Sequence, residues 1–143
     1  MKSVLISIKP KWCEKIVSGQ KTIEVRKTAP KETPFKSYIY CTWGNSKENY
    51  ALGKRGKVIG EFVSNKVEMS IVGYIGHEPC YWDLLAGSCI TKDELMNYGK
   101  WKTLYGWNIS DLKIYDKPKE LSEFFAKCHI PENKCKLCDN CFE

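Results

Sequence analysis

The chain has 143 residues, of which 43% are hydrophobic and 13% aromatic. This length and composition predict one folded domain with a core and exclude a disordered chain. No apolar run approaches the roughly 18 residues of a membrane span, and the N-terminus lacks the apolar stretch of a secretory signal, which together predict a cytoplasmic protein without membrane partners. The net charge of +6 lies entirely in residues 1–36, a local basic field that indicates either a phosphate-bearing partner or a solvated lysine-rich surface.

The first quarter of the chain predicts a strand, a short helix and a second strand. Residues 4–8 form a short apolar run that is typical of a buried strand. Pro10 suits the first turn of a helix and Gly19 suits the position just after its end, so we expect a helix over 10–18. The two residues therefore predict where the chain turns toward the next strand.

Residues 21–26 alternate between polar and apolar side chains, which predicts the second strand. Ile23 and Val25 are expected to face the core, and Glu24 and Arg26 to share the opposite face. The sequence thus predicts a charged strand face within the basic stretch that begins at Gly19.

The remaining segments alternate between short strands, short helices and polar loops. Their pattern argues against a regular βαβ sheet and predicts an α+β domain, a small and mostly antiparallel β-barrel with short flanking helices. In chain order we expect a strand at 38–42, a polar loop at 43–56, one long strand at 57–69, a helix at 81–85 closed by Gly87, a helix from the capping box Thr91–Glu94 to about Tyr98, a strand at 104–115 with a bulge near Ser110, and a helix at 118–126.

Arginine is rare in this chain, which has 21 lysines and only Arg26 and Arg55. A planar guanidinium suits bidentate contact with phosphate or carboxylate, so both residues are candidate ligand contacts. Arg26 could instead form a structural ion pair with Glu24. Arg55 lies at the basic tip of the loop at 43–56, where a plain solvated turn is the alternative interpretation.

The segment from Ser7 to Arg26 carries the pattern helix, then Gly-x-Lys-x-x-Glu-x-Arg, at Gly19, Lys21, Glu24 and Arg26. In this pattern the chain resembles bacterial ASCH domain proteins of the PUA-like superfamily, over roughly residues 3–125. The resemblance implies a PUA-like β-barrel with a cleft beside the first helix. It also implies binding of RNA or a nucleotide.

The expected ligand-binding residues are Gly19, Lys21, Glu24, Arg26 and Arg55. A carboxylate at position 24 can accept a hydrogen bond from an amino group on a base edge, and the cations can hold phosphate or a carbonyl oxygen. The first hypothesis is therefore a module that binds nucleic acid, RNA in the first place, or a nucleotide.

One branch of the family resembles small amidohydrolases that act on acylated cytidine, where a Lys activates a Thr three residues later. Here Lys21 matches the Lys, but Glu24 occupies the position of the Thr. Thr22 directly follows Lys21 and is therefore not at that position. The alternative hypothesis is thus a hydrolase of a modified nucleoside with Lys21 and Glu24 as its catalytic acid–base pair.

A cysteine-rich tail, residues 127–143, follows the domain at 1–126. Cys128, Cys135, Cys138 and Cys141 have a spacing that can hold a structural Zn²⁺, whereas free thiols in a reducing compartment are the alternative. No other cofactor is expected. A third hypothesis is an adaptor that docks a protein partner through this tail.

Overall fold

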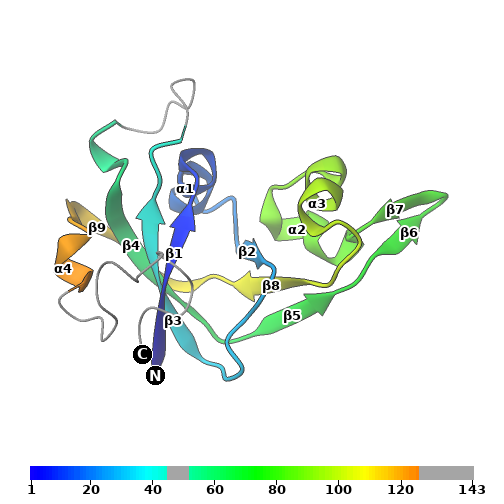
Figure 1. The fold of residues 1–143 in the computed structure, drawn as a ribbon, viewed down its shortest axis with the longest axis horizontal. Helices are drawn as coiled ribbons and strands as arrows, with labels where there is room; N and C mark the ends of the chain where they lie inside the picture. Colours follow the sequence, from blue (N-terminus) through cyan, green and yellow to red (C-terminus); the bar gives the residue numbers. More distant parts are fainter. Residues whose placement is uncertain (45–51, 126–143) are drawn as a thin grey trace.

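The computed structural model describes residues 1–44 and 52–125, and its largest sheet has the strand order β1-β3-β4-β9 (Figure 1). Helix α1 packs on one face of this sheet and helix α4 on the other. The elements of this part are β1 (Lys2–Ile8), α1 (Pro10–Val17), β3 (Phe35–Cys41), the short 3-10 helix η1 (Leu52–Lys54), β4 (Lys57–Ser64), β9 (Ser110–Lys119) and α4 (Ser122–Phe125).

Alternation along β1 explains the two-sided packing of this sheet. Val4, Ile6 and Ile8 join the core cluster that contains buried residues of α1, whereas Leu5 joins the cluster that contains Phe124 of α4. Apolar side chains therefore occupy both faces of β1, as a strand covered on both sides requires.

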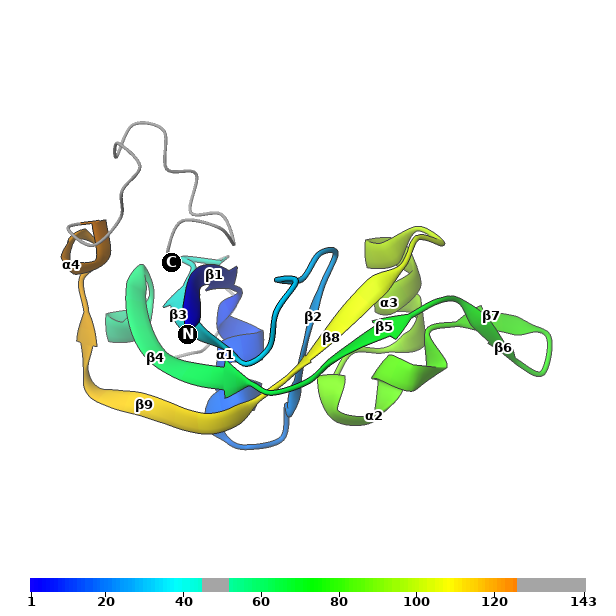
Figure 2. The same cartoon turned by 90° about the horizontal axis from the view of Figure 1, so that it is seen from below.

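A second sheet has the order β2-β8-β5 and lies beside the first, with a separate hairpin, β6–β7, extending beyond it (Figures 1 and 2). A core cluster with Val25, Leu84 and Leu95 joins this sheet to the helical segments η2 and α3. The elements are β2 (Ile23–Arg26), β5 (Val67–Ser70), β6 (Gly73–Ile75), β7 (Glu78–Cys80), η2 (Trp82–Leu84), α2 (Leu85–Ser88), α3 (Lys92–Gly99) and β8 (Leu104–Asn108).

The α+β class is confirmed, but the sheets of the described residues do not close into the expected barrel. Strands β1 and β9 form the two edges of the first sheet, and β1 pairs with β3 in parallel. The chain between β1 and β3 passes through α1 and β2, which allows a parallel connection that a simple hairpin cannot make. Several short strands in a sequence do not distinguish a barrel from sheets placed side by side.

The two long strands expected at 57–69 and 104–115 are each divided between the two sheets, so both expectations were wrong in extent. The two places where the chain passes from one sheet to the other are hydrogen-bonded to each other, at Lys66 and Asn108. The backbone N–H of Lys66 donates to Asn108 Oδ1 at 2.8 Å, and the backbone N–H of Asn108 donates to the Lys66 carbonyl at 3.1 Å. Strand periodicity continues through such a crossing, so it does not reveal the change of sheet.

The starts of α1 and α3 were predicted well. Helix α1 begins at Pro10, and α3 has both reciprocal bonds of the capping box between Thr91 and Glu94. Helix α4 is shorter than expected at its N-terminal end, because Pro118 and Lys119 still belong to β9. The expected helix at 81–85 is η2 followed by α2, where Ala86 and Gly87 leave helical geometry.

The cysteine-rich tail lies outside the described residues, so the zinc site expected there stays a prediction. Within residues 1–44 and 52–125 no three metal-ligating side chains come together. In the same ranges, no helix has the length and apolar character needed to cross a bilayer.

Candidate functional site

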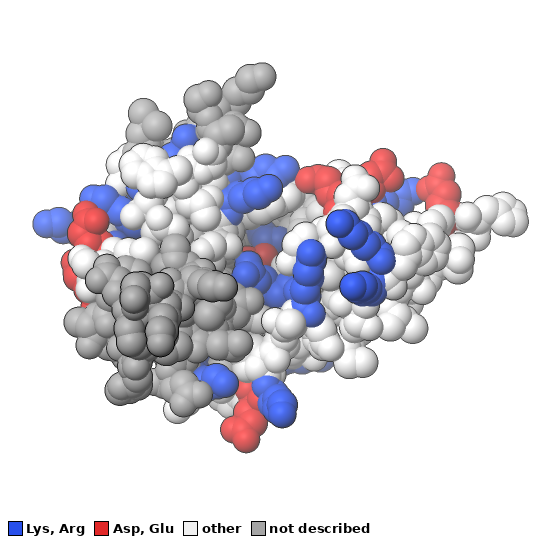
Figure 3. Space-filling view, in the orientation of Figure 1, with Lys and Arg blue, Asp and Glu red and all other residues white. Residues whose placement is uncertain are grey.

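A cavity of about 460 Å³ lies between α1 and α3, with β2 at its base. Figure 3 shows the molecule hollowed in this region, with basic side chains around the hollow and an acidic side chain visible inside it. The lining residues come from the end of β1, the start of α1 and the residue before it, β2, and α3 with the segment that leads into it: Ser7, Ile8, Lys9, Lys11, Trp12, Glu24, Val25, Arg26, Ile90, Glu94, Asn97 and Tyr98.

The position of β2 explains how the charged residues reach this cavity. Among the described residues β2 is an edge strand that pairs with β8 alone, with Glu24 opposite Trp107 and Arg26 opposite Tyr105. Alternate residues of a strand project from the same sheet face, so Glu24 and Arg26 share a face, as the sequence predicted. Val25 is buried in the core cluster against η2 and α3, which also agrees with the predicted alternation.

Glu24 is buried rather than exposed on this strand face, with a side chain that is 6% exposed. Its Oε1 accepts the backbone N–H of Val25 at 3.0 Å and lies 3.9 Å from Lys21 Nζ. The Glu24 carboxylate thus lines the cavity, and the buried Lys21 ammonium lies close to it.

Lys21 does not line the cavity, because its side chain is fully buried. The ammonium donates to the Ser88 carbonyl at 2.6 Å and lies 5.1 Å from the centre of the Trp12 ring. Burial lowers the pKa of Lys21, while the negative charge of Glu24 opposes that shift. The geometry makes Lys21 a partner of Glu24 rather than a surface contact.

The carbonyl that receives Lys21 is positioned by the turn at Gly87. Gly87 has a φ of +86°, and its carbonyl accepts the backbone N–H of Thr22 at 2.7 Å. An added Cβ at Gly87 would lie 2.6 Å from Thr22 Oγ1, so only glycine fits this close approach without displacement. The turn therefore couples the α2 segment to the beginning of β2.

Arg26 lies at the cavity with its guanidinium directed toward β1. Its Nη1 donates to the Ser7 carbonyl at 3.2 Å, which ties β2 to the end of β1. The structural and the ligand-binding interpretations of Arg26 are therefore compatible, because the side chain makes an internal hydrogen bond and also lines the cavity.

Helix α1 and helix α3 supply aromatic and charged groups on opposite sides of the cavity. Lys11 forms an ion pair with Glu94 at 3.1 Å and lies 4.3 Å from the centre of the Trp12 ring. Burial raises the pKa of Glu94, but hydrogen bonds from Lys11 and Thr91 outweigh it and hold that pKa below its ordinary value. Glu94 therefore remains a carboxylate at neutral pH.

Besides Lys21, two more of the predicted ligand contacts have structural positions outside the cavity. Gly19 has a φ of +81° and follows α1, where its N–H donates to the Ile16 carbonyl. Arg55 is 5% exposed and its Nη1 donates to the Trp43 carbonyl at 3.3 Å, so the expectation of an exposed basic tip was wrong at this residue. Neither residue lines the cavity.

Sequence reasoning missed the side chains that complete the cavity, above all Lys9, Lys11, Trp12, Asn97 and Tyr98. Those of α1 precede the motif and could have been found, since a helix that starts beside the motif strand brings its first turn to the same place. Those of α3 carry no local signal, because only the tertiary fold brings that helix opposite α1.

The Cys13 thiol on α1 is fully buried and donates to the Ile8 carbonyl at 3.5 Å. A hydrogen bond with Cys41, together with burial, raises the pKa of Cys13 far above that of an ordinary thiol. This cysteine is thus a packed core residue and is not activated as a nucleophile.

Similarity to solved structures supports the fold. Crystal structures of ASCH from Zymomonas mobilis, in its unmodified form and as a mutant, match 92% of this chain with TM-scores of 0.63 and 0.62. They share 19% sequence identity with it, and the match covers 84% and 87% of their own chains. No protein-family model and no curated protein matches the sequence. The resemblance seen in the sequence motif is thus confirmed at the level of the fold.

Proposed function

We propose that this chain, which has the fold of the ASCH proteins, binds a nucleic acid, RNA in the first place, or a nucleotide in the cavity between α1 and α3. The observation that carries the proposal is a buried carboxylate, Glu24, in a cavity that also holds cations and aromatic rings. Each of these groups matches one part of a nucleotide.

Glu24 supplies the group that recognises a base. Its carboxylate accepts hydrogen bonds only, so it favours a base edge that presents amino hydrogens. Lys21 places a positive charge 3.9 Å away, and an opposite charge at this distance favours the ionised form of a carboxyl group. In this proposal Lys21 acts on the ligand through Glu24.

The cavity walls supply contacts for the phosphate and the base plane. Arg26, Lys9 and Lys11 can neutralise a phosphate, and Trp12 and Tyr98 offer ring faces for stacking. The volume of about 460 Å³ lies in the range of about 300–1,000 Å³ that is typical of small-ligand sites. One nucleotide unit therefore suits the space.

Replacing Arg26 with Ala is expected to weaken RNA binding by about tenfold or more, because a charge-assisted phosphate contact is lost. The slope of log affinity against log salt should also become shallower, by about 0.7 per lost single-strand phosphate contact. Fluorescence anisotropy with a labelled single-stranded RNA over a salt series measures both effects.

The matched control is Lys117→Ala, which removes an exposed cation on β9 that does not line the cavity. It should leave affinity nearly unchanged. Because Arg26 also holds the Ser7 carbonyl, thermal unfolding of the Arg26 variant must show a folded protein. Wild-type protein that binds neither RNA nor nucleotides at low salt would overturn the proposal.

A hydrolase acting on a modified nucleoside is the second candidate, and the buried Lys21–Glu24 pair beside the cavity favours it. The lowered pKa of Lys21 brings its titration closer to neutral pH, as proton transfer requires. The reaction would add water across an amide, releasing a carboxylic acid and the free amino group of the base.

This candidate predicts that purified protein converts N-acetylcytidine to cytidine and acetate, with loss of turnover in Lys21→Met and Glu24→Gln. Chromatographic separation of the two nucleosides measures the reaction. No product with wild-type protein would exclude this substrate and leave the binding function as the proposal.

A further inference from the structure

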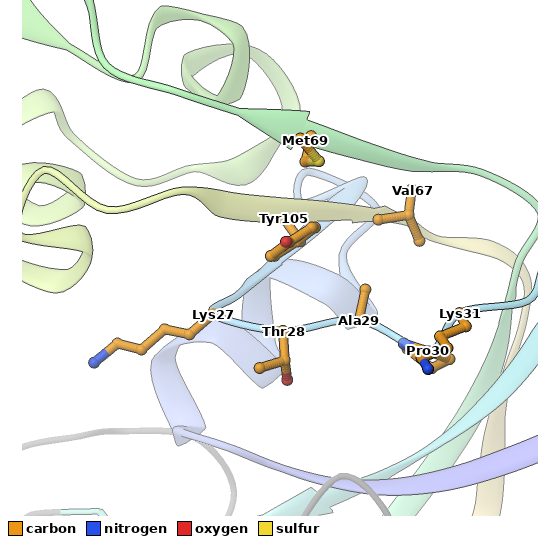
Figure 4. Close-up of a pocket in the computed structure, with 8 residues that line it drawn as sticks. All are labelled: Lys27, Thr28, Ala29, Pro30, Lys31, Val67, Met69 and Tyr105. Atoms are coloured by element: carbon orange, nitrogen blue, oxygen red, sulfur yellow. The ribbon is translucent and has the colours of Figure 1, made fainter.

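A second pocket of about 440 Å³ lies next to the first cavity, around Tyr105, Met69 and the segment that follows β2 (Figure 4). The register of the sheet β2-β8-β5 shows where this second pocket lies. Tyr105 is opposite Arg26 on one side and opposite Met69 on the other. Because opposed residues share a sheet face, Arg26, Tyr105 and Met69 project from one face in a row across β2, β8 and β5.

Lys27 connects the two spaces. It is one of the residues that line the second pocket, and in Figure 4 its side chain extends away from the other labelled residues. Its ammonium lies 4.7 Å from the centre of the Tyr98 ring, and Tyr98 lines the first cavity. A ligand that leaves the first cavity beside Arg26 therefore meets Lys27 before it reaches the second pocket.

The second pocket combines an apolar floor with cations. Met69 is 67% exposed although it is a large apolar side chain, and the half-buried ring of Tyr105 lies opposite it in the sheet. Lys27 and Lys31 are both exposed at this pocket. An apolar platform beside cations fits a base with its neighbouring phosphates.

We propose that the ligand is a single-stranded oligonucleotide that spans both sites, with one nucleotide in the first cavity and a downstream or upstream base on Met69 and Tyr105. Lys27 and Lys31 hold the phosphates between and beyond the two bases. The inference rests on the proposed binding function and deepens it by giving the strand a second binding site beyond the first cavity.

The distance across the sheet sets the length of the strand. The row from β2 to β5 crosses two inter-strand spacings, or about 10 Å. A stacked strand has one phosphate per about 3.4 Å, so about three phosphates cover that distance. A tetranucleotide is therefore the shortest convenient probe.

The test compares 5′-nucleotides with tetranucleotides of adenosine, cytidine and uridine by isothermal titration calorimetry. Wild-type protein should bind at least one tetranucleotide about tenfold or more tightly than the matching 5′-nucleotide, because additional phosphate and stacking contacts form. Deoxyribose tetranucleotides in a parallel series distinguish RNA from DNA as the source of the strand.

Lys31→Gln and Met69→Gln change exposed residues of the second pocket, so both variants should fold. Each should weaken tetranucleotide binding by about threefold to tenfold and leave 5′-nucleotide binding unchanged. Lys117→Gln removes an exposed lysine on β9 and is the matched control, which should affect neither ligand.

The outcomes separate the two proposals. If wild-type protein binds 5′-nucleotides but tetranucleotides bind no more tightly, or if both pocket variants behave as wild type, the spanning strand is wrong and the cavity site stands. If wild-type protein binds no nucleotide and no tetranucleotide, the proposed function and this inference both fail.

Discussion

Glu24→Gln is expected to lower the free energy of unfolding by about 3–5 kcal/mol, because it leaves the buried Lys21 ammonium without its counter-charge. The amide keeps the size of the side chain and removes only the charge. Urea unfolding followed by circular dichroism at neutral pH measures the loss.

The pH dependence of this effect follows from the lowered pKa of Lys21. Between that lowered pKa and the ordinary lysine pKa, the unfolded chain binds more protons than the folded one, so stability rises with pH in this window. Removing Glu24 takes away the charge that opposes the shift, which lowers the pKa further and widens the window toward neutral pH. The difference between wild type and Glu24→Gln should therefore shrink at mildly alkaline pH.

A double variant, Lys21→Met with Glu24→Gln, tests whether the unpaired charge of Lys21 causes the loss of stability in Glu24→Gln. Replacing both charges should recover much of the stability that Glu24→Gln loses, because an apolar side chain no longer needs a counter-charge. A single variant as stable as wild type at neutral pH would show that Lys21 does not depend on Glu24.

Gly87→Ala is expected to lower the free energy of unfolding by about 2–5 kcal/mol, from a left-handed backbone worth about 1–2 kcal/mol and overpacking worth about 1–3 kcal/mol. The added Cβ would lie 2.6 Å from Thr22 Oγ1 and 3.2 Å from Ile23 Cδ1. The same variant should also weaken ligand binding, since it displaces the Ser88 carbonyl that holds Lys21.

Gly19→Ala separates the backbone cost from the overpacking cost that are combined in Gly87→Ala. Gly19 has a similar φ of +81°, but nothing lies within 4 Å of an added Cβ there. We expect a loss of only about 1–2 kcal/mol, which is the backbone cost alone. Equal losses at both glycines would contradict the packing argument at Gly87. Thermal and urea unfolding of the two variants provide the comparison.

Local signals in the sequence predicted local structure. Pro10 marked the start of α1 and the Thr91–Glu94 capping box marked the start of α3, because both act through the backbone of the same turn. The alternation of Glu24, Val25 and Arg26 predicted which side chains share a face of β2. These features depend on neighbours in the chain and are therefore visible in it.

Features that depend on distant segments were missed. Asn108 contacts Lys66 where both predicted strands change sheet, and no local pattern marks that contact. Lys21 was expected at the cavity surface, but its burial depends on the Ser88 carbonyl, 67 residues later. Arg55 was placed on an exposed tip, whereas the structure directs its guanidinium to the Trp43 carbonyl.

The pairing of β2 also has a consequence for the order in which the chain can fold during synthesis. In the part of the chain that the structure describes, the candidate binding strand β2 has β8 as its one neighbour in the sheet, and their paired residues are about 80 positions apart. At roughly 5–20 residues per second, a ribosome needs several seconds to add that length. During that time the nascent chain carries Glu24 and Arg26 on a strand without a partner, so the cavity is assembled only after most of the domain has been made.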